Sequence, residues 1–165
     1  MKRLLVLGLR IAIVMSMAVA AISHAQEARM SQVAKGEFTV SFQPLTFEGV
    51  DAEAQLGRMS IDKQIAGDLV ATTKGQMLSA MTNTKGSAGY VAIERVSGTL
   101  NGKHGTFVLQ HTGLMNRGKP SLSVVVVPDS ATGELVGISG DFKIIIEGGK
   151  HFYEFTYSLP DNNGA

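Results

Sequence analysis

Glu94 and His111 are the two side chains in this sequence whose types and spacing best suit acid–base chemistry. Each lies in a run rich in β-branched and aromatic residues. A carboxyl group on an apolar wall has a raised pKa, and a nearby imidazole can exchange a proton with it. A cofactor-free isomerase or cyclase needs such an exchange. The alternative is a buried pair that stabilises the fold and sets the strand register, because structural pairs also have shifted pKa values.

A long β-hairpin is predicted to bring these two residues together. Residues 90–96 and 106–112 have strand composition, and Asn101-Gly102 between them suits a type I′ turn. Counting outward from this turn pairs Ala92 with His111, and the alternation of side chains then sorts the hairpin into two faces. We expect the inward face to be the one with both aromatic rings, although the other face also carries Val and Ile residues. It consists of Tyr90, Ala92, Glu94, Val96, Phe107, Leu109 and His111.

A second hairpin is predicted from residues 142–146 and 151–157, which close on Gly148-Gly149. Its register places Lys143 opposite Glu154 on the solvent side, and an apolar set on the other side. That set consists of Phe142, Ile144, Ile146, His151, Tyr153, Phe155 and Tyr157.

The inward faces of the two hairpins supply the candidate ligand-binding residues. The tyrosine hydroxyls would suit a ligand with an apolar body and one polar group. The alternative is a filled core with these hydroxyls at its rim. The candidates are Tyr90, Phe107, Leu109, Phe142, Ile144, Tyr153, Phe155 and Tyr157.

The other segments also read as strands. Residues 38–42 and 58–65 alternate between apolar and polar side chains, and residues 121–127 form a continuous apolar run. Residues 67–81 form a longer run that Gly75 interrupts, which indicates either a bent strand or a bulge. No amphipathic helix is visible after residue 25. About eight strands joined by short turns predict an all-β protein, a single closed antiparallel barrel or, failing that, a sandwich. An eight-stranded barrel is either filled by side chains or holds one small ligand.

Several other chemistries are disfavoured. His104, His111 and His151 lack short ligand spacing and there is no cysteine, so we expect neither a metal nor a cofactor. Ser60 and Lys63 match an S-x-x-K string, but on a strand their side chains point to opposite sides. Gly133, Gly137 and Gly140 lack the Gly-Lys-Ser/Thr sequence of a phosphate loop and are turn glycines.

Residues 1–25 are predicted to be a signal peptide, and residues 26–165 a single domain. Lys2, Arg3 and Arg10 make the start basic, an apolar run follows at 11–22, and Ser23-His24-Ala25 suits a signal peptidase. The run is too short to span a bilayer, so we expect a periplasmic or secreted protein without a membrane anchor. The 15 basic residues include three in this segment, so 12 basic and 14 acidic residues follow it. A net charge of −2 argues against nucleic acid as a partner.

Two motifs resemble a known family. Residues 89–100 with 105–111, and residues 132–140, are similar to motifs of the bacterial domain-of-unknown-function family 3224, and the resemblance extends over about 34–159. It implies an eight-stranded barrel related to that of plant allene oxide cyclase. It implies no activity, and no catalytic residue transfers from it.

Three functions remain open at this level. The first is an exported barrel that binds a small apolar or lipid-like ligand. The second is the isomerase or cyclase that uses Glu94 and His111, and the third is a filled barrel for protein contacts. Homo-oligomers are also possible, because residues 121–127 would make a contact surface if apolar on their outer face. Cavity volume separates the filled barrel from the others.

Export gives the first testable prediction. When the full-length precursor is expressed in a bacterium with a secretion pathway, the extracytoplasmic protein should begin at Gln26, and its intact mass should match residues 26–165. Ala25→Arg should block cleavage, because the peptidase requires a small residue there. An unprocessed protein retained in the cytoplasm would contradict the prediction.

Overall fold

The computed structural model describes residues 30–49, 51 and 55–160, and within them the protein contains β-strands and no helices. The predicted signal peptide lies outside the described residues. Among them, no helix is long and apolar enough to cross a membrane. The strands are β1 (Gln32–Leu45), β2 (Leu56–Gly67), β3 (Leu69–Met81), β4 (Ala88–Leu100), β5 (Lys103–Asn116), β6 (Lys119–Val126), β7 (Thr132–Gly133), β8 (Ser139–Glu147) and β9 (Lys150–Ser158).

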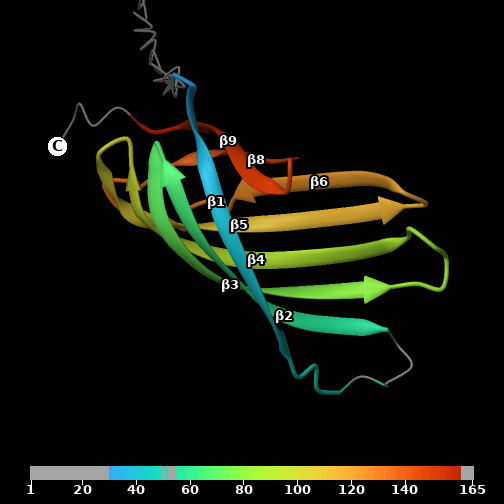
Figure 1. The fold of residues 1–165 in the computed structure, drawn as a ribbon. Helices are drawn as coiled ribbons and strands as arrows, with labels where there is room; N and C mark the ends of the chain where they lie inside the picture. Colours follow the sequence, from blue (N-terminus) through green and yellow to red (C-terminus); the bar gives the residue numbers. More distant parts are fainter. Residues whose placement is uncertain (1–29, 50, 52–54, 161–165) are drawn as a thin grey trace, which may run out of the picture.

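Eight of these strands close into an antiparallel barrel (Figure 1). The sheet runs in the order β1, β2, β3, β4, β5, β6, β8, β9, and β9 pairs again with β1. The short β7 adds a two-residue pairing to β5 near the β4–β5 turn. The prediction of a single closed antiparallel barrel of about eight strands is therefore confirmed.

Both predicted hairpins have the predicted registers. In β4–β5, Ala92 pairs with His111, and the turn residues Asn101 and Gly102 have φ angles of 46° and 82°. These positive angles are what a type I′ turn needs. In β8–β9, Lys143 pairs with Glu154.

The segment 67–81, predicted as a bent or bulged strand, differs from this prediction in two ways. Gly67 ends β2 with φ +113°, and β3 begins at Leu69. At Gly75 the register of β3 with β2 and β4 continues without an inserted residue, so there is no bulge. A Cβ at Gly75 would lie 2.5 Å from the carbonyl oxygen of Ile93, so glycine is needed because β3 and β4 approach closely there.

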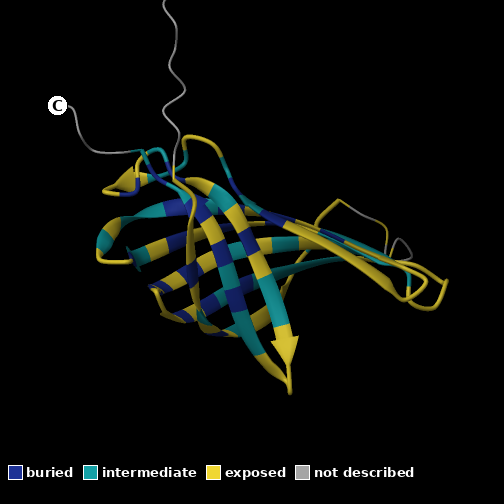
Figure 2. Ribbon diagram, turned by 90° about the horizontal axis from the view of Figure 1, so that it is seen from above, coloured by how far each residue is buried: buried dark blue, intermediate teal, exposed yellow. Residues whose placement is uncertain are grey.

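The ring of paired strands is complete over only part of the barrel's length, because the strands differ in length. We call this part the closed end and the opposite part the open end. β8 and β9 have nine residues each, whereas β1 to β5 have 12 to 14. Pairing of β1 with β9 ends at Phe38–His151, and β6 pairs with β8 only at Val125–Asp141. Beyond these points the long strands continue as an extension of the sheet, which projects from the barrel in Figures 1 and 2. We call the concave side of this extension the trough.

Large side chains fill the closed end. The rings of Phe142 and Tyr153 stack with centroids 5.0 Å apart, and those of Phe107 and Phe155 are 5.6 Å apart. The Tyr153 hydroxyl accepts a hydrogen bond from the backbone N–H of Leu69 at 2.9 Å, which ties β9 to β3 across the interior. The largest fully buried apolar side chains are Tyr153, Tyr157, Phe107, Phe142, Phe155, Leu69, Leu100, Leu109, Leu135 and Val96.

The outward face of β6, where the run 121–127 would have made a contact surface if apolar, combines serines with the half-buried Val125, and the exposed Leu122 lies on the cavity side. Val124 and Val126 are buried inside the barrel, and the alternate positions that face outward include Ser121 and Ser123. Exposed apolar side chains on the convex side of the extension come from β2 to β5 instead. They are Leu56, Leu78, Val91, Ile93 and Leu114.

The Tyr153 hydroxyl should contribute measurably to stability. Tyr153→Phe leaves the buried N–H of Leu69 without its partner, which we expect to cost about 1–3 kcal/mol in the free energy of unfolding. Tyr157→Phe is the matched control. Its hydroxyl bonds the side chains of Asn101 and Gln32, both of them exposed residues that can turn to water, so its loss should be smaller. Urea unfolding measures both variants, and equal losses would contradict this account.

Candidate functional site

Four polar side chains are buried together inside the barrel. Lys63 on β2, Thr73 on β3, Glu94 on β4 and His111 on β5 are 3%, 2%, 0% and 1% exposed. The strands are consecutive, and the alternation of side chains turns all four residues inward. Because polar groups in such a place must satisfy one another, their hydrogen bonds define the site.

The carboxylate of Glu94 is the centre of this cluster. Its Oε2 accepts hydrogen bonds from the Lys63 ammonium and from Nε2 of His111, the latter at 2.9 Å. Its Oε1 accepts from the Thr73 hydroxyl, whose oxygen accepts the backbone N–H of Lys63 at 2.9 Å. No buried side-chain nitrogen or oxygen within the described residues lacks a hydrogen-bond partner.

These contacts hold Glu94 in its ionised form. Burial alone would raise the pKa of this carboxyl group. The hydrogen bond from His111, the charge and hydrogen bond of Lys63, and the hydrogen bond from Thr73 together lower the pKa to about 2. For Lys63, burial lowers the pKa of the ammonium and the Glu94 carboxylate opposes this effect.

A cavity of about 340 Å³ opens directly above the cluster, at the open end of the barrel. Lys63 and His111 are part of its wall, and Glu94, which lies behind them, is not. The rest of the wall is mainly apolar. It comes from β1, β3, β4, β6, β8 and β9, together with one further residue of β2. It consists of Phe38, Val40, Phe42, Ile61, Met77, Tyr90, Leu122, Ile144, Ile146 and His151. We call this space the mouth cavity.

The mouth cavity continues into the trough. A second hollow of about 460 Å³ shares Met77, Tyr90 and Leu122 with it and is lined almost entirely by apolar side chains. The Tyr90 ring packs against the glycine opposite it on β5, since a Cβ at Gly113 would lie 2.1 Å from its Cε1. Burial, followed by the negative charge of Glu94, raises the pKa of Tyr90, so its hydroxyl stays protonated at neutral pH.

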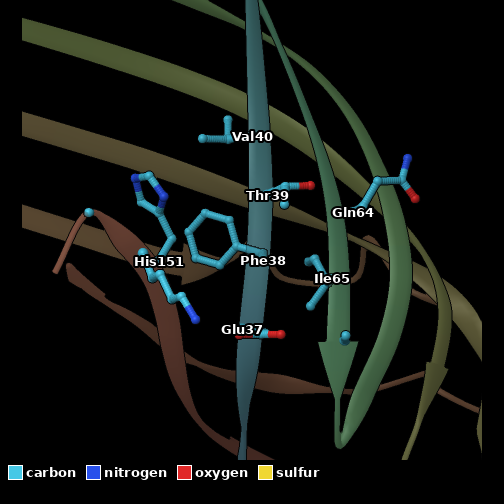
Figure 3. Close-up of a pocket in the computed structure, with 10 residues that line it drawn as sticks. Glu37, Phe38, Thr39, Val40, Gln64, Ile65 and His151 are labelled. Atoms are coloured by element: carbon cyan, nitrogen blue, oxygen red, sulfur yellow. The ribbon is translucent and has the colours of Figure 1, made fainter. Parts of the chain in front are cut away.

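At the rim, the pairing of β1 with β9 ends. Figure 3 shows Phe38 and His151 lying close together there, with Val40 on the same side of β1 and Thr39 on the other. The Phe38 and His151 ring centroids are 5.2 Å apart, and the Lys63 ammonium lies 5.4 Å from the Phe38 ring centroid. The Phe38 ring therefore lies beside both His151 and the Lys63 ammonium at the rim.

The structure brings Glu94 and His111 together, as the hairpin register predicted. Of the eight candidate ligand-binding residues, it places Tyr90 and Ile144 in the wall of the mouth cavity. The other six do not line this cavity, because they lie toward the closed end and pack against one another there. These six core residues are Phe107, Leu109, Phe142, Tyr153, Phe155 and Tyr157.

The sequence reasoning missed Lys63 and Thr73. Lys63 lies between Ile61 and Ile65 in the alternation of β2, so the inward face of that strand already contained it. A lysine side chain is usually exposed to solvent, because its charge is costly to bury. Only a carboxylate from another strand makes the burial of Lys63 possible. The S-x-x-K string lies on this strand, where Ser60 and Lys63 face opposite sides, as expected.

A metal site is not visible in the part of the chain that the structure describes, where no three His, Cys, Asp or Glu side chains converge. His104 is exposed beside the β4–β5 turn and contacts the Thr99 hydroxyl. His151 is partly buried at the rim.

The lowered pKa of Glu94 predicts acid sensitivity. The folded state holds this pKa at about 2, below the ordinary value of 4.5, so the stabilisation is complete above pH 4.5 and is lost as the pH falls toward 2. The loss should be roughly 3 kcal/mol, measured as the free energy of urea unfolding at several pH values.

Glu94→Gln should be less stable at neutral pH and should lose much less stability between pH 4.5 and pH 2. Glu154→Gln is the control, because Glu154 also has a lowered pKa but makes an exposed ion pair with Lys35 at 3.0 Å. Solvent screens that pair, so its removal should leave the acid transition nearly unchanged. Identical acid transitions in wild type and Glu94→Gln would contradict the assignment.

Comparison with known proteins agrees with the fold. Residues 34–157 match the family model described as "Protein of unknown function (DUF3224)". A crystal structure of a protein with unknown function from this family, from Shewanella oneidensis MR-1, is 47% identical in sequence with a TM-score of 0.75. The similarity covers 79% of this chain and 99% of that one. A search of curated proteins gave no match. The chain therefore belongs to the DUF3224 family, and it shares its barrel with the solved member from Shewanella oneidensis.

Proposed function

We propose that this protein binds a small, mainly apolar ligand in the mouth cavity, with the ligand's polar group against Lys63 and His111. The observation that carries the proposal is the combination of a half-open barrel with an apolar wall and two polar side chains at its base. A volume of about 340 Å³ lies within the range of roughly 300–1,000 Å³ typical of small-molecule sites. The sequence-based prediction that the protein is exported is part of this proposal, which places the ligand outside the cytoplasm.

The shape of the site favours an elongated ligand. The mouth cavity and the trough share three wall residues, so a molecule seated on the polar base can extend along the concave side of β3 to β6. The trough wall contains Met59, Met77, Met81 and Met115. Methionine side chains adapt to differently shaped apolar partners, which suits a lipid-like or aromatic molecule.

The other two functions have less support. A filled barrel describes only the closed end. An isomerase in which Glu94 acts directly on the substrate is disfavoured, because Lys63, Thr73 and His111 surround its carboxylate and it is not part of the cavity wall.

A fluorescent apolar probe tests the binding proposal. N-phenyl-1-naphthylamine should bind to the full-length protein with increased emission. Val40→Phe, which fills the mouth cavity, should weaken this binding at least about tenfold, equivalent to 1.4 kcal/mol. Val70→Phe is the matched control, because Val70 is 61% exposed and is not part of the cavity wall.

Native mass spectrometry of the purified protein provides a second measurement, since a co-purifying small molecule would add its mass. Equal probe affinity in Val40→Phe and Val70→Phe, or no binding by the wild type, would contradict a site in the mouth cavity.

A further inference from the structure

The base of the mouth cavity presents two groups of different chemical character. Lys63 and His111 come from β2 and β5, and both donate to the same oxygen, Oε2 of Glu94. This shared acceptor holds the ammonium and the imidazole side by side although β3 and β4 separate their strands. A ligand group that reaches the base of the cavity therefore meets both.

The hydrogen bond to Glu94 determines which nitrogen of His111 carries the proton. Because Nε2 faces an ionised carboxylate, the neutral imidazole keeps its proton on Nε2 and has a lone pair on Nδ1. Nδ1 makes no hydrogen bond with any described residue, yet no buried side-chain nitrogen among these residues lacks a partner. Because Glu94 occupies Nε2 and His111 lines the mouth cavity, Nδ1 is the ring nitrogen left to accept a proton from a ligand there.

Lys63 offers the complementary function. Its ammonium has three N–H groups, and one of them donates to Glu94. The remaining donors can stabilise negative charge on a ligand oxygen. Burial makes such a charge–charge interaction stronger than it would be in water.

We propose that the mouth cavity catalyses proton transfer at the carbon next to the carbonyl group of an apolar ketone or aldehyde. The inference rests on the proposed function, because the substrate must occupy the same cavity. His111 is the general base, Lys63 the oxyanion-stabilising group, and Glu94 a positioning residue that does not touch the substrate.

The step balances without a further reactant. Nδ1 of His111 takes the proton from the α-carbon, the C–H electron pair becomes the C=C bond of an enolate, and the carbonyl π pair moves onto oxygen. The Lys63 ammonium hydrogen-bonds that oxygen, and the Glu94 carboxylate stabilises the imidazolium. If the proton on Nδ1 exchanges with a solvent deuteron before delivery, return to the same carbon gives isotope exchange with solvent. With a β,γ-unsaturated ketone, delivery to the γ-carbon gives double-bond isomerisation.

Hydrogen–deuterium exchange tests the inference directly. The full-length protein is incubated in D₂O with 4-phenyl-2-butanone, whose aromatic body and single ketone match the cavity, and loss of the α-proton signals is followed by ¹H NMR. The wild type should accelerate exchange at least about 100-fold over His111→Gln, the lower end of what a positioned base contributes. His104→Gln, with the same substitution at an exposed histidine, should keep the wild-type rate.

Further variants separate the roles of the two supporting residues. Lys63→Met should slow exchange at saturating ketone, whereas Lys74→Met, at an exposed lysine, should not. Glu94→Gln should lower kcat with little change in KM, because it disturbs the tautomer of His111 and leaves the cavity wall intact. A purely structural role for Glu94 would instead change the amount of folded protein and leave kcat per folded molecule unaltered.

The outcomes distinguish this inference from the proposed function. If native mass spectrometry detects the bound ketone but the wild type does not accelerate exchange, the inference fails and binding stands. If neither the ketone nor N-phenyl-1-naphthylamine binds, both fail. If the variants at buried positions do not fold, inhibition of the wild-type protein by butylbenzene provides the test instead. This hydrocarbon of similar shape should suppress the wild-type exchange competitively, and exchange that persists at saturating butylbenzene overturns the assignment to this cavity.

Discussion

An ionised carboxylate inside a protein requires partners, and the arrangement of this barrel interior follows from that requirement. Glu94 is fully buried and accepts hydrogen bonds from side chains of three other strands. Removal of one partner from such a cluster leaves an uncompensated charge, which is far more costly than the loss of an exposed pair. The cluster therefore constrains the registers of β2 to β5 relative to one another. The same constraint positions Lys63 and His111 at the base of the cavity.

The second determinant of the proposed site is a difference in strand length. If β8 and β9 were as long as β1 to β5, the barrel would close along its whole length and the polar cluster would be sealed in the core. Because they are short, pairing ends at Phe38–His151 and at Val125–Asp141, and the interior opens above the cluster. One end of the barrel thus provides stability through packed aromatic rings, and the other end contains the proposed binding site. The division explains how a barrel of eight strands can be both filled and hollow.

The cluster also links stability to chemistry. Its hydrogen bonds keep Glu94 ionised, and an ionised Glu94 is what orients the imidazole of His111 and retains the ammonium of Lys63. A hydrophobic replacement of the cluster could give an equally stable barrel. It would give a cavity without polar groups at its base. The buried charges are therefore better explained by the proposed site than by the needs of the fold.

Local sequence patterns determined the strand registers of the two long hairpins. The Asn101-Gly102 turn and strand alternation gave the register of β4–β5, and with it the contact between Glu94 and His111, because in a hairpin both depend on residues close in the chain. The tertiary structure alone decided which inward residues meet the cavity. Phe107 and Tyr90 share one face of the same hairpin, yet one is core and the other cavity wall, because strand ends distant in sequence set the depth at which the barrel opens. The tertiary structure also decided the burial of Lys63. The partner that makes this burial possible is the Glu94 carboxylate, which lies two strands away in the sheet.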